Sequence, residues 1–235
     1  MPKKLQTIGF DADDTLWHNE RFFVLTQERF ADLLRDYAEK DHLAERLIEA
    51  ERRNIGHYGF GVKGFVLSMI ETAIEVTEGK VPAEVISDLL AAGREMLDHP
   101  IELLPHVEDV LETLRGDYRL IVVTKGDLLD QERKLAQSGL RERFDAVEIV
   151  SHKTEAAYRH IFKQHGQGAA RGLMVGNSLA SDVRPMIEAG GWGVYVPHDL
   201  TWAMEHAEPP TNSPRFAEIN DLSGLPETVK KIVSG

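Results

Sequence analysis

Beyond Pro105 the sequence alternates between helical segments and short apolar strands. The helical segments are VEDVLETLR, DLLDQERKLAQSG, TEAAYRHIFKQHG and DVRPMIEAG, and the strand-like runs between and after them are YRLIVVT, FDAVEIV, GLMVG and WGVYVP. Such alternation favours parallel strands joined by right-handed helical crossovers, which cover both faces of one sheet. We therefore predict an α/β fold with a three-layer α/β/α, Rossmann-like core. RFAEI and LPETVKKIV predict a last strand and helix.

The segment LQTIGFD belongs with these strands, although a long helical block separates it from them. From about residue 22 to residue 97 hydrophobic side chains recur at helical spacing, and HPIELLP then ends the block with two prolines. We predict a core domain of residues 1–17 and 104–235, and an inserted α-helical cap domain of residues 18–103. The two connections between them are close together and are expected to act as a hinge.

Charge and composition disfavour nucleic-acid and membrane association and exclude chemistry that needs cysteine. The chain of 235 residues has a formal net charge of -12 and no cysteine. The negative charge disfavours binding to a nucleic acid backbone, and the lack of cysteine excludes disulfides and thiolate metal sites. No apolar run reaches the roughly 18 residues of a membrane span, so we expect a cytoplasmic protein without membrane association. The oligomeric state stays open.

Polar side chains gather where the predicted strands end. They are Asp11 and Asp13, then Thr124, Lys125 and Asp127, then Lys153, and finally Asn177, Ser178 and Asp182. In open parallel sheets, ligands bind beyond the carboxyl ends of the strands. Carboxylates suit a divalent cation such as Mg²⁺, whereas a hydroxyl and two lysines suit an oxyanion. The combination favours phosphoryl transfer.

These residues fall into four motifs, which occur along the chain as IGFDADDT, LIVVTKGD, VSHKTEAAYRHIF and VGNSLASD. In this order they resemble the motifs of the haloacid dehalogenase (HAD) superfamily, most closely its Mg²⁺-dependent phosphatase branch with a helical C1-type cap. The resemblance covers roughly residues 5–17 and 104–197. The helical block resembles the cap only in being helical.

The resemblance implies a phosphatase that hydrolyses a small phosphorylated metabolite. Asp11 would be the nucleophile that forms an aspartyl-phosphate, and Asp13 the acid that protonates the leaving oxygen and later activates water. Thr124 and Lys153 would neutralise the phosphoryl oxygens in the transition state. Lys125 is assigned to substrate binding, at the rim of the site.

The resemblance also implies an Mg²⁺ site made of Asp11, the backbone carbonyl of Asp13, and the fourth motif with Asn177 and Asp182. Many relatives have an acid in the place of Asn177. The amide oxygen of asparagine can still coordinate Mg²⁺ or hydrogen-bond a metal-bound water, but the site loses one negative charge unless Asp182 or Asp127 moves closer. We therefore predict weaker Mg²⁺ binding than in an aspartate variant.

Three alternatives to a phosphatase remain open. A 2-haloacid dehalogenase also uses an aspartate nucleophile, although relatives with that activity lack the second acid that Asp13 provides. A phosphomutase would differ only in its cap residues. A HAD-like module that has lost turnover and only binds a phosphorylated ligand is motivated by Asn177.

Two further patterns have simpler interpretations. Asp14 is predicted to be a cap of the following segment or a solvated residue, not a catalyst, because aspartate favours cap positions. Gly59, Gly61 and Gly64 match GxGxxG, but they lie in the helical block and follow no strand. We interpret them as a connection between cap helices, where glycine supplies positive φ angles. Alternatively this connection faces the core, with His57, Tyr58 or Lys63 selecting the leaving group.

Overall fold

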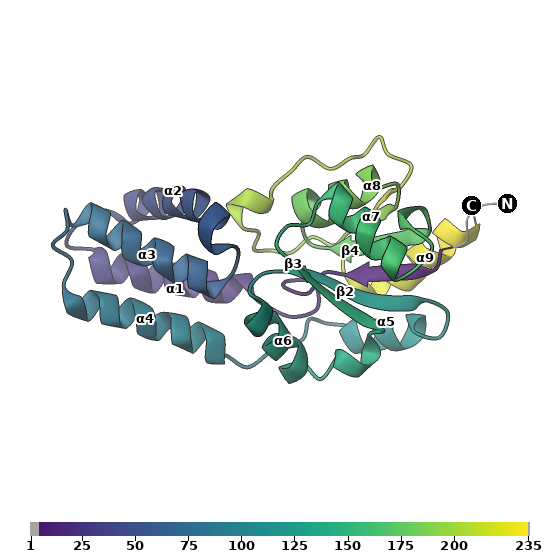
Figure 1. Cartoon of the computed structure of the whole chain (residues 1–235), viewed down its shortest axis with the longest axis horizontal. Helices are drawn as coiled ribbons and strands as arrows, with labels where there is room; N and C mark the ends of the chain where they lie inside the picture. The colour runs from purple at the N-terminus through teal and green to yellow at the C-terminus, as the bar shows by residue number, and fades with distance from the viewer. Residues whose placement is uncertain (1–4, 235) are drawn as a thin grey trace. The chain divides into compact units, whose positions relative to one another are not determined.

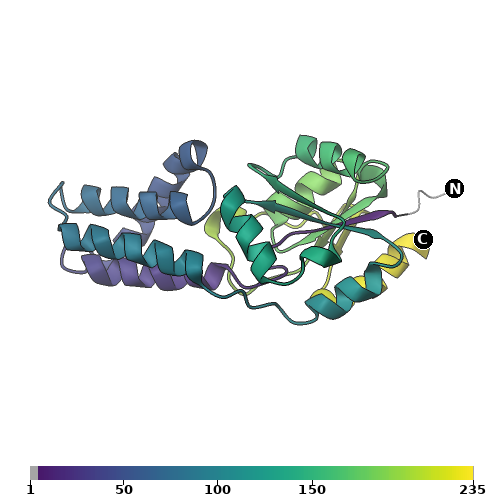
Figure 2. The ribbon, with the colours of Figure 1, turned by 60° about the horizontal axis from the view of Figure 1, so that its bottom comes forward.

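The computed structural model describes residues 5–234, which divide into two compact units (Figures 1 and 2). The α/β unit consists of residues 5–20, 101–125 and 131–234, and the helical unit of residues 21–100 and 126–130. Within residues 5–234 no helix combines the length and the apolar composition that a membrane crossing requires.

The α/β unit is built on one parallel sheet of six strands in the order β3-β2-β1-β4-β5-β6. The strands are β1 (Thr7–Phe10), β2 (Arg119–Lys125), β3 (Ala146–Val150), β4 (Gly172–Gly176), β5 (Trp192–Tyr195) and β6 (Phe216–Glu218). The order runs one way from β1 to β3 and the other way from β4 to β6. The reversal therefore lies between β1 and β4, where open sheets bind their ligands.

The strand register aligns the predicted site residues at the carboxyl ends of β1, β2 and β4. Phe10 pairs with Val122 of β2 and with Val175 of β4. Asp11 follows Phe10 directly, and Thr124 and Asn177 come two residues after its partners. Because all the strands are parallel, these side chains leave the sheet at the same edge.

Helices cover both faces of this sheet. Leu120 and Val122 belong to a hydrophobic cluster with α5 (Val107–Leu114) and α9 (Leu225–Ser234). Ile121 and Val123, which alternate with them, pack in a second cluster with α7 (Glu155–Gln164) and α8 (Arg184–Glu188). This alternation across a doubly buried sheet confirms the predicted three-layer core, and Figure 2 shows α7 above the sheet with α5 and α9 below it.

The other elements outside residues 21–100 are short, apart from α6 (Leu128–Gln137), which follows β2 and begins in residues that group with the helical unit. A π-helical turn, η3 (Leu179–Val183), separates β4 from α8. The 3-10 helices are η1 (Arg141–Arg143), η2 (Ala169–Arg171), η4 (Ala203–Glu205) and η5 (Leu222–Gly224).

The helical unit contains α1 (Glu20–Leu34), α2 (Lys40–Tyr58), α3 (Val62–Val76) and α4 (Ala83–Asp98). Its core gathers Phe30, Leu34, Leu43, Leu47, Phe65, Met69 and Leu89. Gly59, with φ of 74°, ends α2, and Gly61, with φ of 113°, precedes α3. The GxGxxG stretch is thus a connection between helices that needs positive φ, as predicted from the sequence.

Candidate active site

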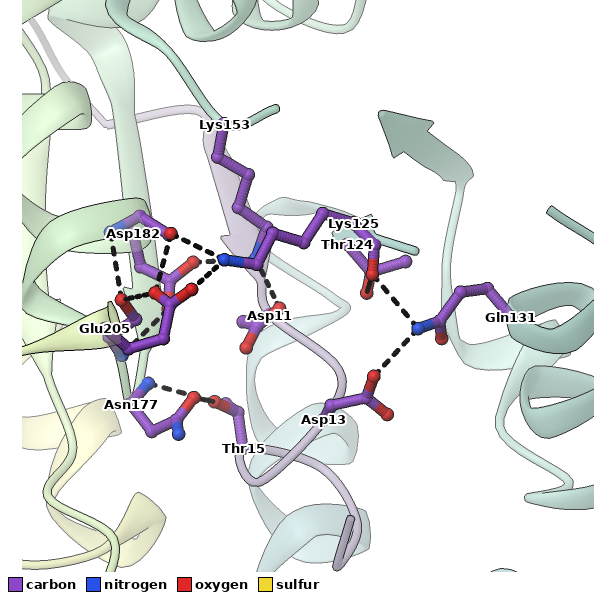
Figure 3. Close-up of polar contacts among 12 residues, drawn as sticks. Asp11, Asp13, Thr15, Thr124, Lys125, Gln131, Lys153, Asn177, Asp182 and Glu205 are labelled. Atoms are coloured by element: carbon purple, nitrogen blue, oxygen red, sulfur yellow. Dashed lines mark hydrogen bonds and ion pairs between the residues drawn. The ribbon is translucent and has the colours of Figure 1, made fainter. Parts of the chain in front are cut away.

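The site is assembled where β1 ends. The backbone N–H of Asp11 donates to the carbonyl of Val175 at 2.9 Å, which fixes the start of the acidic segment against β4. Figure 3 shows Asp11 and Asp13 with side chains from β2, α6 and the turn after β4 around them. The seven residues that the sequence predicted for catalysis, substrate binding or metal binding are brought into one connected region; they are Asp11, Asp13, Thr124, Lys125, Lys153, Asn177 and Asp182.

Lys153 lies between two buried carboxylates. Its ammonium donates to Asp11 Oδ1 and, at 2.7 Å, to Asp182 Oδ1, and its side chain is only 2% exposed. Asp182 is fully buried, and its Oδ2 accepts the backbone N–H of Ser178 at 3.0 Å. Both oxygens of Asp182 are therefore engaged, so its contacts favour positioning Lys153 over binding a metal.

This arrangement shifts the pKa values of both Asp11 and Lys153. Burial and the negative charge of Asp182 raise the pKa of Asp11 to about 7, although Lys153 opposes the shift. Burial acts to lower the pKa of Lys153, but the charges of Asp11 and Asp182 outweigh it and raise that pKa above 10.5. The lysine is thus held as an ammonium.

Asp13 has a different environment from Asp11. Its Oδ1 accepts from Trp17 Nε1 at 2.8 Å and from Lys134 Nζ at 3.0 Å, and its Oδ2 accepts from Gln131 Nε2 at 2.7 Å. Burial alone would raise the Asp13 pKa, but the charge of Lys134 and these hydrogen bonds lower it below 3.8. Two carboxylates, two residues apart, thus have pKa values shifted in opposite directions, with Asp11 raised.

Gln131 and Lys134 were not predicted as site residues. They lie three positions apart on α6, so they share one face of that helix, and both are buried. Polar residues on a buried helix face are a signal that the sequence contained. Gln131 also donates to the Lys125 carbonyl at 3.1 Å, which ties α6 to the end of β2.

The side-chain amide of Asn177 faces two of the oxygens that the resemblance assigns to a metal. One terminal atom of this amide lies 3.2 Å from Asp11 Oδ2 and 3.2 Å from the carbonyl oxygen of Asp13. With nitrogen in that place, the amide donates to both oxygens. With oxygen there, three oxygens face one another. Neighbouring ligands of an octahedral Mg²⁺ at about 2.1 Å are roughly 3.0 Å apart, so the second orientation fits such an ion.

A cation in this place would have few charged ligands. Within residues 5–234 no group of three or more His, Cys, Asp or Glu side chains is arranged to hold a metal ion. The donor set would consist of Asp11, one carbonyl oxygen, the amide oxygen of Asn177 and water. Mg²⁺ accepts such a set, because it prefers hard oxygen ligands and keeps several waters.

Thr124 and Lys125 end β2 and differ in their surroundings. Thr124 is buried at 3% exposure, and its hydroxyl lies 3.5 Å from the carbonyl of Lys125, a long contact. The Lys125 ammonium donates to Ser181 Oγ at 2.8 Å and forms an ion pair with Glu205. Glu205 was not predicted as a site residue.

Two other acids have contacts that separate them from this network. The carboxylate of Asp14, whose φ is 59°, accepts the backbone N–H groups of Asn19 and Glu20, which confirms its predicted capping role. Asp127 pairs with Lys63 at 2.7 Å within the helical unit.

A family model described as a haloacid dehalogenase-like hydrolase matches residues 5–190. The chain belongs to this family. The predicted membership of the HAD superfamily is therefore confirmed, and with it the hydrolase class.

Solved structures show the same fold. A haloacid dehalogenase-like family hydrolase from Xanthomonas campestris superposes with a TM-score of 0.88 at 38% identity, covering 98% of this chain and 92% of that protein. The HAD-type protein YfnB of Bacillus subtilis, whose structure is described as bound to magnesium, superposes with a TM-score of 0.67 at 18% identity, covering 97% of this chain and 99% of YfnB.

A curated relative carries a named activity. The pyrimidine 5'-nucleotidase YjjG of Escherichia coli is 30% identical over 93 residues. The aligned part makes up 37% of this chain and 41% of YjjG, so the match spans less than half of that nucleotidase.

Proposed function

We propose that this HAD-family hydrolase is an Mg²⁺-dependent phosphatase that hydrolyses a small phosphomonoester through an aspartyl-phosphate on Asp11. The observation that carries the proposal is the pair of carboxylates at the end of β1. The Asp11 pKa is raised to about 7, and the Asp13 pKa is lowered by Lys134 and its hydrogen bonds. In the protein alone these shifts oppose the two roles, because a nucleophile needs an ionised carboxylate and a general acid a protonated one. Both roles therefore rely on the charges of a bound cation beside Asp11 and a bound phosphate near Asp13, which act against both shifts.

The chain's own residues would divide the reaction between them. An Asp11 oxygen attacks phosphorus, and Asp13 gives a proton to the leaving oxygen. The negative charge of a bound substrate raises the Asp13 pKa, which lets it hold that proton. Asp13 then takes a proton from the water that attacks phosphorus and releases Asp11.

The charges on the phosphoryl oxygens also need partners. The ammonium of Lys153 contacts Asp11, and Thr124 is the second-last residue of the neighbouring strand β2, which supports the proposal that both bind these oxygens. Mg²⁺ bound by Asp11, the Asp13 carbonyl and Asn177 would supply the remaining neutralisation. A dication beside Asp11 would also favour the ionised, nucleophilic form of its carboxyl group.

The named relative directs the choice of substrates. Because YjjG is a pyrimidine 5'-nucleotidase, we place nucleoside 5'-monophosphates first among the small phosphomonoesters to be tested. Sugar phosphates and phosphorylated organic acids complete the set.

The test is phosphate release from this set with Mg²⁺ or with EDTA. We expect Mg²⁺-dependent hydrolysis of at least one compound, and a loss of about 10³-fold or more in Asp11→Asn, because that variant lacks the nucleophile. Asp109→Asn, which changes an exposed aspartate of α5, is the matched control and should leave turnover unchanged. Full turnover in Asp11→Asn would refute the assigned nucleophile.

A second candidate is hydrolytic dehalogenation of a 2-haloacid, which the amide at position 177 favours. An amide that donates to Asp11 Oδ2 at 3.2 Å orients this nucleophile without a metal. Halide release from 2-chloropropionate in EDTA, together with no phosphate release from any phosphomonoester, would move the assignment to this reaction.

A further inference from the structure

The segment that follows β5 returns to the candidate site. His198 lies near its start, with Nε2 3.6 Å from Asp14 Oδ1 and its ring 6.0 Å from the ring of His18. The segment then enters η4, whose last residue is Glu205. The Glu205 side chain is only 13% exposed, so its carboxylate is mostly shielded from water.

Three donors converge on the Glu205 carboxylate. Oε1 pairs with the Lys125 ammonium, and Figure 3 shows these two residues side by side. Oε2 accepts from the hydroxyls of Ser178 and, at 2.7 Å, Ser181. Lys125 also donates to Ser181 Oγ at 2.8 Å, and the backbone N–H of Ser181 donates to Ser178 Oγ at 2.9 Å. The four side chains therefore form one closed network.

Each partner of Glu205 is the chain neighbour of a residue that the resemblance assigns to the site. Lys125 follows Thr124, Ser178 follows Asn177, and Ser181 precedes Asp182. A charge-assisted hydrogen bond is stronger and shorter than a neutral one, so a carboxylate holding three such donors restricts their backbone turns. Glu205 is thus bound to the turn after β2 and to the turn after β4 at once.

We propose that Glu205 is a positioning residue for the reaction, which joins these two turns and so holds Thr124, Asn177 and Asp182 in place. The inference rests on the proposed phosphatase function. We call Glu205 with Lys125, Ser178 and Ser181 the clamp. Because the Glu205 carboxylate balances the charge of the Lys125 ammonium, Lys125 belongs to the clamp, and Thr124 and Lys153 are the residues that bind the phosphoryl group. A misplacement of catalytic groups by about 1 Å is enough to cost roughly 100-fold in rate.

The main test compares Glu205→Gln with Glu208→Gln, which changes an exposed glutamate of the same segment. Hydrolysis of p-nitrophenyl phosphate is measured with saturating Mg²⁺, at a temperature well below the melting point of each variant. We expect Glu205→Gln to lower kcat about 10- to 100-fold with KM nearly unchanged, because the lost positioning acts in the transition state. Glu208→Gln should match the unaltered protein. Wild-type kcat in a folded Glu205→Gln would overturn the proposal.

Amide hydrogen exchange provides a readout that does not depend on turnover. Peptides covering residues 124–130 and 176–183 should exchange faster in Glu205→Gln, whereas peptides from α5 should not change. If the unaltered protein hydrolyses no phosphomonoester, the proposed function fails, and exchange alone then decides whether Glu205 holds the two turns. Unchanged exchange in both peptides would overturn the clamp.

A shorter acid keeps the test decisive if Glu205→Gln does not fold. Glu205→Asp retains the negative charge that balances Lys125 but shortens the reach by one methylene. We expect the same loss of kcat and the same faster exchange, whereas wild-type values for both in Glu205→Asp would overturn the proposal.

Discussion

Replacing Lys153 by methionine should destabilise the α/β unit in a pH-dependent way. The ammonium lies between Asp11 and Asp182, which are 7% and 0% exposed, and its own side chain is 2% exposed. Lys153→Met keeps much of the volume but leaves two buried carboxylates without a cation. Breaking a buried ion pair from one side typically costs about 3–5 kcal/mol.

In the variant a buried carboxylate can avoid its uncompensated charge by binding a proton, and the free energy of that protonation sets the size of the destabilisation. Protonating an ordinary carboxyl group with a pKa near 3.9 costs about 4 kcal/mol at pH 7 and about 1.5 kcal/mol at pH 5. Lys153 is the group that lowers the Asp11 pKa against burial and the charge of Asp182, so its removal raises the Asp11 pKa further. In the variant the folded state holds the proton more tightly than the unfolded state. Stability is therefore retained at low pH and lost as the pH rises.

The assay is urea unfolding in EDTA at pH 5 and pH 7, followed by tryptophan fluorescence. The three tryptophans, Trp17, Trp192 and Trp202, all belong to the α/β unit, so the signal reports on that unit. Lys163→Met, which changes an exposed lysine of α7, is the control for loss of a lysine. A free energy of unfolding for Lys153→Met that equals that of the control at both pH values would refute the reasoning.

Other variants test single contacts of the site. Asn177→Asp should lower the Mg²⁺ concentration for half-maximal activity roughly tenfold, since it adds a charge beside the ion; an unchanged or higher concentration would contradict this. Gly176→Ala should destabilise by roughly 1–3 kcal/mol in urea, because a Cβ there would lie 2.2 Å from Asp182 Oδ2, whereas Gly116→Ala, with open space, should not. Asp14→Ala should lower the free energy of unfolding in urea by about 1 kcal/mol, because it removes the acceptor for two backbone N–H groups. An unchanged free energy of unfolding would exclude the capping role.

The sequence predicted the sheet because its strands are local features with a clear signal. Apolar runs such as LIVV in β2 are buried on both faces, and helices with periodic hydrophobic residues separate them. Parallel strands then place every strand end at one edge. This is why Asp11, Thr124 and Asn177 were predicted to be neighbours from chain order alone.

The contacts between side chains were harder to predict. Asp182 was predicted as a metal ligand, yet both of its oxygens accept from Lys153 and Ser178, and only the folded chain shows this. Glu205 lies 27 residues from Ser178, in a segment of irregular structure with no periodic pattern, so its reach to the site depends on tertiary packing. Neither contact leaves a signal in local sequence.

The central claim is that Asp11 attacks phosphorus, and rapid quenching with a ³²P-labelled phosphomonoester tests it most directly. The substrate is the best one from the phosphate-release set, and the protein is quenched in acid within the first turnover. We expect label on the peptide that contains Asp11, removable by hydroxylamine as an acyl phosphate is, and no label in Asp11→Asn. Phosphate release without any labelled protein, or label on a peptide that lacks Asp11, would contradict the claim.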